Sequence, residues 1–255
     1  RTLLYETARY VDVYKALDDI AKERKLTPEE RQEQKTFSKL ADSFTPLAKG
    51  IGSEFANQNA YDCIQIHGGS GFMKDYACER IYRDSRITSI YEGTTQLQVV
   101  AAIRYVTTGA YLAKIREYET AQVAPEFEGL KNRLKELANK YEAIVTKINE
   151  EKDQELIDFA ARRLVEMSAH LIMSHLMVQD ASKNDLFTES AHVYVRFAES
   201  EIDKHVTFLS KFDKDDFDAA LLEEYTKLDK ISIDYAVMEK ARNIIAARGS
   251  FGWDD

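Results

Sequence analysis

No glycine occurs between Gly129 and Gly249, and the whole chain of 255 residues holds only 10 glycines and 3 prolines. These two residue types form most turns and interrupt most helices. Their scarcity argues against a β-sandwich, which needs frequent turns, and against collagen-like or proline-rich chains. Because 44% of the residues are hydrophobic, the chain can bury a core. We therefore expect an all-α protein.

Apolar residues recur at helical spacing along most of the chain. Thr27 is placed to cap a helix that begins at Pro28, and Pro46 or the pair Gly50 and Gly52 could break that helix. From Phe127 to Ile148 the apolar spacing alternates between 3 and 4, which is typical of a bundle seam. Helices are expected over residues 2–25, 27–67, 77–87, 95–106, 127–148, 153–178, 186–209, 216–227 and 231–247, with Gly249 ending the last.

Charge is distributed unevenly. Residues 1–110 hold 15 basic and 15 acidic residues, so the net charge of −9 lies wholly in residues 111–255. Such an acidic half would repel phosphate backbones, so we expect no nucleic-acid partner. The change in charge also predicts a domain boundary. We expect two helical bundles, one over residues 1–110 and an acidic one over residues 111–255.

The remaining composition limits the class of protein further. The apolar runs are only a few residues long, so we expect no membrane span. Cys63 and Cys78 are too few for a disulfide framework or a thiolate zinc site, so we expect no metal site and a reducing, cytoplasmic location.

His170 and His175 are five residues apart and are interpreted as packed or surface side chains. The chain starts at Arg1, without Met and inside a predicted helix, which suggests a piece of a longer protein.

A glycine-rich turn follows the second predicted helix, from His67 to Gly71. Glycines let backbone N–H groups approach a phosphate without hindrance from side chains. Short glycine turns are also common as plain connections. The turn by itself therefore leaves both interpretations open.

Glu92 stands at a junction between a loop and a helix. A carboxylate there often caps the helix or interacts with its dipole. Because Gly93 follows it and Thr94 or Thr95 can cap the helix, Glu92 could instead point into a cavity. Ile90 and Tyr91 would then form an apolar wall that raises the carboxyl pKa and makes it a better base.

Three blocks, residues 65–72, 79–87 and 90–98, together resemble the C-terminal helical domain of the acyl-CoA dehydrogenases. They read Gln-Ile-His-Gly-Gly-Ser-Gly-Phe, Glu-Arg-Ile-Tyr-Arg-Asp-Ser-Arg-Ile and Ile-Tyr-Glu-Gly-Thr-Thr-Gln-Leu-Gln. The resemblance implies that residues 1–110 form that family's four-helix up-and-down bundle. Residues 111–255 resemble the extra helical domain at the end of some longer members. Ser70 departs from the family, where larger residues are frequent.

The resemblance implies an FAD enzyme that oxidises a fatty acyl-CoA to the trans-2-enoyl-CoA. Glu92 would remove the α-proton while the β-hydrogen leaves as hydride to flavin N5, and electrons would pass to an electron-transfer flavoprotein. Tyr91 and Gly93 would contact the substrate. A shared cofactor implies a homodimer or homotetramer. The FAD contacts would be Gln65, Ile66, His67, Gly68 and Gly69 from the neighbouring subunit, and Thr94 and Gln96 from the same subunit.

Other interpretations stay open. An acyl-CoA oxidase shares the fold and passes electrons to oxygen, and a non-catalytic helical interaction or oligomerisation module could keep the motif without the activity. Some family members place the catalytic Glu on an earlier helix. We expect the chain alone to be inactive and to bind FAD weakly or not at all. The charged residues of the second block are expected to form a structural ion-pair network: Glu79, Arg80, Arg83, Asp84 and Arg86.

Overall fold

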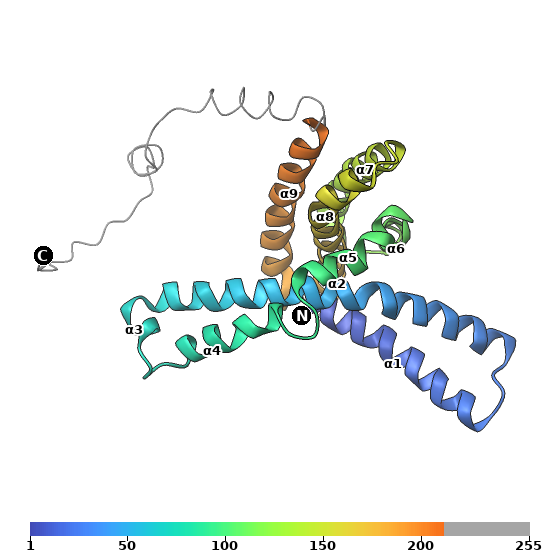
Figure 1. Cartoon of the computed structure of the whole chain (residues 1–255), viewed down its shortest axis with the longest axis horizontal. Coiled ribbons are helices and arrows are strands. Elements are labelled where there is room, and N and C mark those ends of the chain that lie inside the picture. The colour runs from blue at the N-terminus through green and yellow to red at the C-terminus, as the bar shows by residue number, and fades with distance from the viewer. Residues whose placement is uncertain (212–255) are drawn as a thin grey trace, which may run out of the picture. The chain divides into compact units, whose positions relative to one another are not determined.

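The computed structural model describes residues 1–211, and these residues form helices and connections without any strand (Figure 1). This confirms the all-α prediction. The expected helices over 216–227 and 231–247, and the stop at Gly249, lie outside the described residues. The elements are α1 (Thr2–Glu23), α2 (Pro28–His67), α3 (Gly69–Phe72), α4 (Ala77–Arg86), η1 (Ile87–Ser89), α5 (Thr95–Thr107), α6 (Ala110–Glu119), η2 (Pro125–Phe127), α7 (Glu128–Glu150), α8 (Gln154–Ala181), η3 (Asp185–Phe187) and α9 (Thr188–Lys211).

The 40-residue helix α2 is the element around which the first half is built. Thr27 begins it with a capping box, in which its hydroxyl accepts from the Glu30 N–H at 3.2 Å and the Glu30 carboxylate accepts from the Thr27 N–H at 2.9 Å. Pro46 lies inside the helix and does not end it, so the segment is one long helix and not two. A Cβ at Gly50 would stand 3.1 Å from the Gln98 Cβ, so this small residue lets α5 approach closely.

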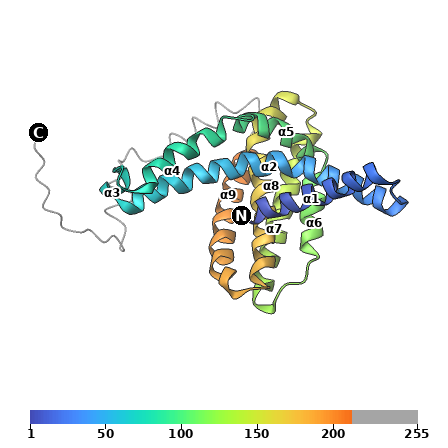
Figure 2. The same cartoon turned by 90° about the horizontal axis from the view of Figure 1, so that it is seen from below.

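Helix α1 packs along the first half of α2, whereas α3 and α4 lie along its second half (Figures 1 and 2). The Tyr10 ring of α1 meets Phe44 of α2 edge-on, with centroids 5.0 Å apart. Tyr61 of α2 and Tyr82 of α4 have ring centroids 6.3 Å apart. The two ends of α2 therefore carry different partners, and the glycine-rich turn connects α2 to the second of them.

Helices α7, α8 and α9 run side by side and cross the α2 layer. The seam predicted from Phe127 to Ile148 is confirmed, because its members are buried except for Leu130, which is partly exposed. Helix α8 is the most deeply buried, with Met167, Leu171 and Ile172 fully enclosed. This part of the chain forms a dense helical bundle.

A single hydrophobic core runs from Leu3 to Leu209, and residues 1–210 form one compact unit. Helix α6, which the sequence analysis did not predict, contributes Tyr111, Ile115 and Tyr118 to that core. Residues on both sides of position 110 thus share one core. The division into domains 1–110 and 111–255 stays a prediction.

Candidate functional site

The connection from η1 to α5 contains a strained turn at Glu92 and Gly93. Glu92 has φ of 52°, a left-handed conformation that is uncommon for a residue with a side chain and costs of order 1 kcal/mol. Gly93 has φ of 94°, which residues with a side chain rarely adopt, and a Cβ there would stand 2.7 Å from Gln98 Nε2, so the Gln98 side chain would have to move. Two successive left-handed residues reverse the chain sharply and fix the direction of the Glu92 side chain.

Two neighbouring helices hold this turn through its carbonyl oxygens. Lys49 of α2 donates from Nζ to Thr88 O at 2.5 Å and to Gly93 O at 3.0 Å. Gln98 of α5 donates from Nε2 to Glu92 O at 3.3 Å and to Gly93 O at 3.4 Å. Within residues 1–211 no hydrogen bond or ion pair engages the Glu92 carboxylate. The backbone is anchored while the acidic group stays available.

Thr94, and not Glu92, caps the N-terminus of α5. The Thr94 hydroxyl accepts from the Leu97 N–H at 3.4 Å, which confirms the expectation that Thr94 or Thr95 caps this helix. Thr95 is buried and donates its hydroxyl to a Glu54 carboxylate oxygen at 2.5 Å. The Glu92 carboxylate is therefore not needed as the cap of this helix, which is a common role of a carboxylate at a helix start.

The apolar enclosure expected around Glu92 is not complete in the described part of the chain. Glu92 is exposed, and Ile90 and Tyr91 keep 46% and 49% of their surface accessible. The Tyr91 ring instead lies over the Lys49 ammonium, 5.4 Å from the ring centroid. Residues 1–211 thus supply the candidate base and part of one apolar wall beside it, and water can reach the Glu92 carboxylate.

The glycine-rich turn folds back onto the last turn of α2. Gly68 ends α2 with φ of 58°, and residues 69–72 form the single helical turn α3 where a loop was expected. A Cβ at Gly71 would stand 2.6 Å from Ile64 O, which is closer than real Cβ contacts. A glycine at position 71 is therefore required for the turn to pack against α2.

The residues expected to contact FAD are accessible in two separate places. Those at the end of α2, residues 65–69, are all exposed, with Ile66 at 83%. Thr94 and Gln96, at the start of α5, are also exposed. Lys49, which binds the Glu92 turn, precedes Gln65 by 16 residues of α2, which corresponds to about 24 Å along a helix axis. The structure does not bring the two groups together within one chain.

Cys63, His67 and Cys78 lie together beside the glycine-rich turn. Each offers a sulfur or ring nitrogen, and these three atoms are within 4.8 Å of one another. Counting cysteines alone missed this group because its third member is a histidine. The spacing of Cys63 and His67, four residues apart on one predicted helix, was the available signal.

The two histidines singled out in α8 and the charged side chains of α4 lie outside both the Glu92 turn and the glycine-rich turn. His170 and His175 of α8 are buried, and burial lowers the pKa of each to about 4, which agrees with the expectation of packed histidines. The ion-pair network expected in α4 is limited to long contacts of Arg83, at 3.9 Å to Glu79 and 4.0 Å to Asp84. The Arg86 guanidinium instead donates to the Ser89 hydroxyl at 2.7 Å.

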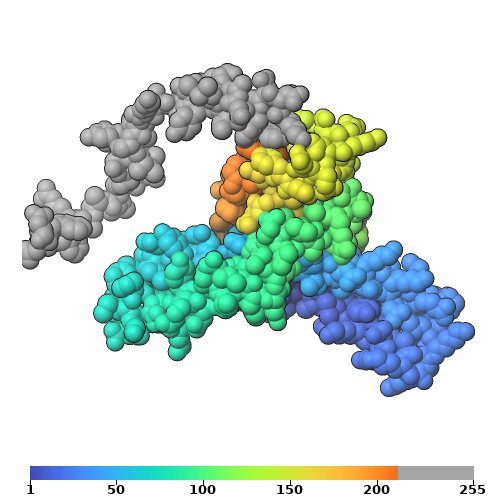
Figure 3. All heavy atoms as spheres, viewed as in Figure 1, coloured from blue at the N-terminus to red at the C-terminus, as the bar shows by residue number. Residues whose placement is uncertain are grey.

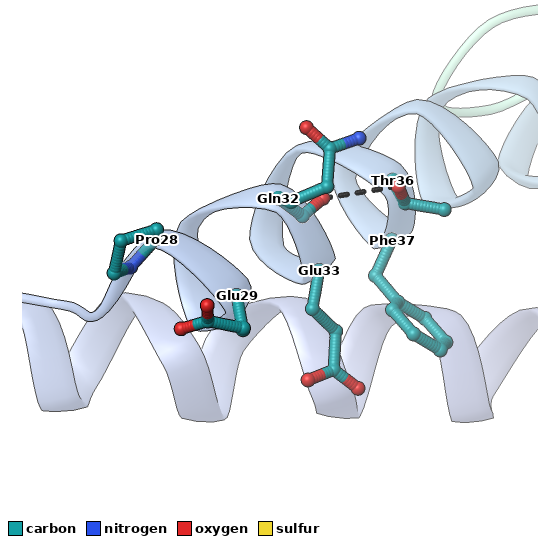
Figure 4. A pocket seen from close by; sticks show the side chains of 6 residues that line it. All are labelled: Pro28, Glu29, Gln32, Glu33, Thr36 and Phe37. Atoms are coloured by element: carbon teal, nitrogen blue, oxygen red, sulfur yellow. Dashed lines mark hydrogen bonds between the residues drawn. The ribbon is translucent and has the colours of Figure 1, made fainter.

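A shallow pocket lies on the first turns of α2 (Figure 4). The Phe37 ring there is 5.9 Å from that of Tyr10 on α1, and the Thr36 hydroxyl donates to the Gln32 carbonyl at 3.0 Å. Its polar groups come from one helix and do not converge on a common point. The six lining residues are Pro28, Glu29, Gln32, Glu33, Thr36 and Phe37.

A second, polar pocket of about 320 Å³ lies between α2 and the segment from α4 to η1. Its lining residues are Glu54, Asn57, Gln58, Tyr61, Tyr82, Arg86 and Ser89. Neither pocket contains Glu92 or the glycine-rich turn. Among the described helices, none has a stretch long and apolar enough to cross a lipid bilayer.

Two family models match successive parts of the chain. One, described as "Acyl-CoA dehydrogenase, C-terminal domain", matches residues 27–106, and the other, "Acyl-CoA dehydrogenase C terminal", matches residues 107–217. The three motif blocks, the helical fold and both matches agree. The chain belongs to the acyl-CoA dehydrogenase family and carries C-terminal helical regions of that family.

Individual relatives match over shorter stretches. An acyl-CoA dehydrogenase of Bacillus subtilis is 44% identical over 63 residues, which are 25% of this chain and 17% of the relative. The "Caffeyl-CoA reductase-Etf complex subunit CarC" of Acetobacterium woodii is 47% identical over 60 residues, 24% of this chain and 16% of the relative. The matched part of the chain thus spans about a sixth of the length of these relatives.

A solved structure of an acyl-CoA dehydrogenase complexed with FAD, from Bacillus anthracis, is similar in fold. The TM-score is 0.62 at 21% sequence identity, and the match covers 91% of this chain and 42% of that chain. This likeness supports the all-α fold of the chain.

Proposed function

We propose that the chain is the C-terminal part of an FAD-dependent acyl-CoA dehydrogenase in which Glu92 is the base that removes the α-proton of an acyl-CoA. The observation that carries this proposal is the turn at Glu92. Its backbone is strained and anchored by Lys49 and Gln98, whereas its carboxylate has no partner in the described residues. Strained residues held in place by their surroundings cluster at functional sites.

The chemistry explains why such a carboxylate is needed. A C–H bond next to a thioester carbonyl is a very weak acid, so its removal requires a well-placed base, a polarised carbonyl and exclusion of water. Bound FAD would supply the acceptor for the β-hydrogen, which leaves as hydride while Glu92 takes the α-proton. Because Gly93 has no side chain, the thioester can approach the base closely. The enclosing walls come from outside residues 1–211, since Glu92 is exposed within them.

Two separated contact groups favour a flavin shared between subunits. Gln65, Ile66, His67, Gly68 and Gly69 would contact the FAD of a neighbouring subunit, and Thr94 and Gln96 that of their own. The distance of about 24 Å along α2 between the two regions is a reason to assign them to different flavins. The protein would then be a homodimer or homotetramer. The exposed apolar side chains around α3 and α4 offer a surface for that association.

Electrons would leave to an electron-transfer flavoprotein. The name of the Acetobacterium relative includes an Etf complex, and this is the support for that partner. The same name describes a reductase, so the direction of the reaction in the cell is a separate question from the chemistry at Glu92. An acyl-CoA oxidase would pass electrons to oxygen, and hydrogen peroxide produced in air distinguishes it.

The test is Glu92→Gln in the full-length enzyme, with Glu29→Gln on an exposed turn of α2 as the matched control. Loss of the base should lower turnover by about 100-fold or more, while flavin content and melting temperature stay close to wild type. The control should keep full turnover. Undiminished turnover of Glu92→Gln would reject the assignment and mean that the base lies elsewhere in the protein, as in family members that place the catalytic Glu on an earlier helix. The 255-residue chain alone is expected to be inactive and to bind FAD weakly or not at all.

A further inference from the structure

We propose that Cys63, His67 and Cys78 form a binding site for a thiophilic divalent metal ion such as Zn²⁺, formed where the end of α2 meets the start of α4. The proposed function assigns no role to Cys63 or Cys78. It assigns His67 to the FAD of a neighbouring subunit, so the metal ion and that FAD would share this one residue. The site includes both cysteines of the whole chain.

The three side chains are brought together by the local fold. Cys63 and His67 are one helical turn apart on α2 and therefore share a face, with the Cys63 sulfur 3.8 Å from His67 Nδ1. Cys78 is the second residue of α4, and its sulfur is buried and lies 3.5 Å from Gly71 O. The close packing of Gly71 on Ile64 O sets how near α4 starts to α2.

The distances suit a metal after a small adjustment. The three candidate ligand atoms already lie within 4.8 Å of one another. Ligands on a tetrahedral zinc ion are roughly 3.4–3.8 Å apart, given Zn–S of about 2.3 Å and Zn–N of about 2.0 Å. Binding thus requires a contraction of at most about 1.4 Å at any pair, which side-chain rotation can supply.

The histidine is also oriented by a neighbour. His67 Nδ1 lies 2.8 Å from Cys63 O. Nδ1 is also the ring nitrogen that lies 3.8 Å from the Cys63 sulfur, so a metal ion held through Nδ1 would replace this hydrogen bond and leave the ring proton on Nε2. Two thiolates and one imidazole prefer Zn²⁺ and its tetrahedral analogues, with a fourth position for water or another ligand.

The test uses the 255-residue chain, reduced and kept free of oxygen, with Co²⁺ and Zn²⁺ as probes. One equivalent of Co²⁺ should produce a thiolate charge-transfer band and the visible bands of a tetrahedral ion. Zn²⁺ should displace it, protect both thiols from alkylation and raise the melting temperature. Failure to produce the charge-transfer band, or alkylation at the same rate with and without Zn²⁺, would overturn the proposal.

Variants assign the ligands. Cys63→Ser and His67→Gln should each weaken Co²⁺ binding by about tenfold or more, since each removes one ligand. Cys63 is partly exposed and His67 is exposed, so both variants should keep the wild-type helical content and melting temperature without metal. His192→Gln, at a histidine of α9 distant in sequence, is the control that should bind as wild type. Equal binding by all four proteins would show an adventitious site and reject the assignment.

Discussion

The segment from residue 61 to 100 and the bundle of α7, α8 and α9 differ in where they place their apolar side chains. Of the 19 large apolar side chains that are exposed in the described residues, 12 lie between Tyr61 and Val100, including Ile66 at 83% and Phe72 at 80%. The bundle instead encloses Leu134, Leu171 and Ile202 almost completely. The bundle thus buries its large apolar side chains against itself, whereas the segment leaves many of its own exposed.

Their backbones differ in the same sense. The segment holds left-handed Gly68, Glu92 and Gly93 and the tight approach of Gly71 to α2, whereas α7, α8 and α9 are long regular helices. In Figure 3 the part formed by α3 and α4, shown in teal, extends away from α7 and α8. The bundle also has one left-handed residue, Lys152 with φ of 51°, in the connection between α7 and α8. The segment differs from it in the number of such residues and in the close approach of Gly71 to α2.

The largest contrast should appear when one side chain is truncated in each region. Leu171→Ala removes a fully buried side chain of α8 and should lower the free energy of unfolding by about 2–5 kcal/mol. Phe72→Ala removes an exposed ring and should change it by less than about 0.5 kcal/mol. Urea unfolding followed by circular dichroism measures both. If both variants lost the same free energy of unfolding, the segment would have a core of its own, and the contrast with the bundle would be wrong.

Within the glycine-rich turn, two neighbouring glycines should respond differently to an added methyl group. Gly71→Ala places a Cβ against Ile64 O and should cost about 1–3 kcal/mol of unfolding free energy. Gly69→Ala meets no atom within 4 Å and should be neutral or slightly stabilising. The two melting temperatures, compared with wild type, give the result. Similar values for both variants would show that the turn does not need its close contact with α2.

Mild acid should act on the bundle through its buried histidines. Burial lowers the pKa of His175 to about 4 in the folded state, against a usual value near 6.5. Between these pH values the unfolded chain therefore binds more protons than the folded chain. The free energy of unfolding is highest above about pH 6.5 and decreases as the pH falls toward 4. Between pH 7 and 5 the loss should be roughly 1–2 kcal/mol for this group.

His175→Gln should reduce that pH dependence, and His67→Gln, at an exposed position of the glycine-rich turn, should leave it unchanged. Urea midpoints at pH 7, 6 and 5 for wild type and both variants provide the measurement. If His67→Gln had the larger effect, acid sensitivity would belong to the segment and not to the bundle.

The sequence predicted the helices well where the apolar period was regular, as in the seam from Phe127 to Ile148. It did not decide whether Pro46 splits α2, because a proline within a helix can be offset by tertiary packing and Pro46 is buried in the core. Helix α6 was not predicted because the charge change near residue 110 indicated a domain boundary there, although Tyr111, Ile115 and Tyr118 have helical spacing.

For the candidate site, the motif blocks located Glu92 and the glycine-rich turn, and elementary capping rules anticipated Thr94. The left-handed φ of Glu92 and the two hydrogen bonds from Lys49 depend on contacts between residues more than 35 positions apart, which a linear pattern does not reveal. Cys63 and Cys78 are close in sequence, but their meeting depends on how the turn at Gly71 packs on α2, which a linear pattern does not reveal either. The exposure of Glu92 within residues 1–211 was not predicted, because the order of residues does not show how far Ile90 and Tyr91 cover the carboxylate.

The φ of 52° at Glu92 has a consequence for evolution in the laboratory. Gly or Asn tolerates this backbone conformation better than Glu, by an amount of order 1 kcal/mol. A selection that rewards only resistance to heat would therefore tend to replace Glu92 with one of these residues. On the proposed mechanism, the more heat-resistant variants would be poor catalysts. Glu92 would be kept only when variants are also selected for turnover.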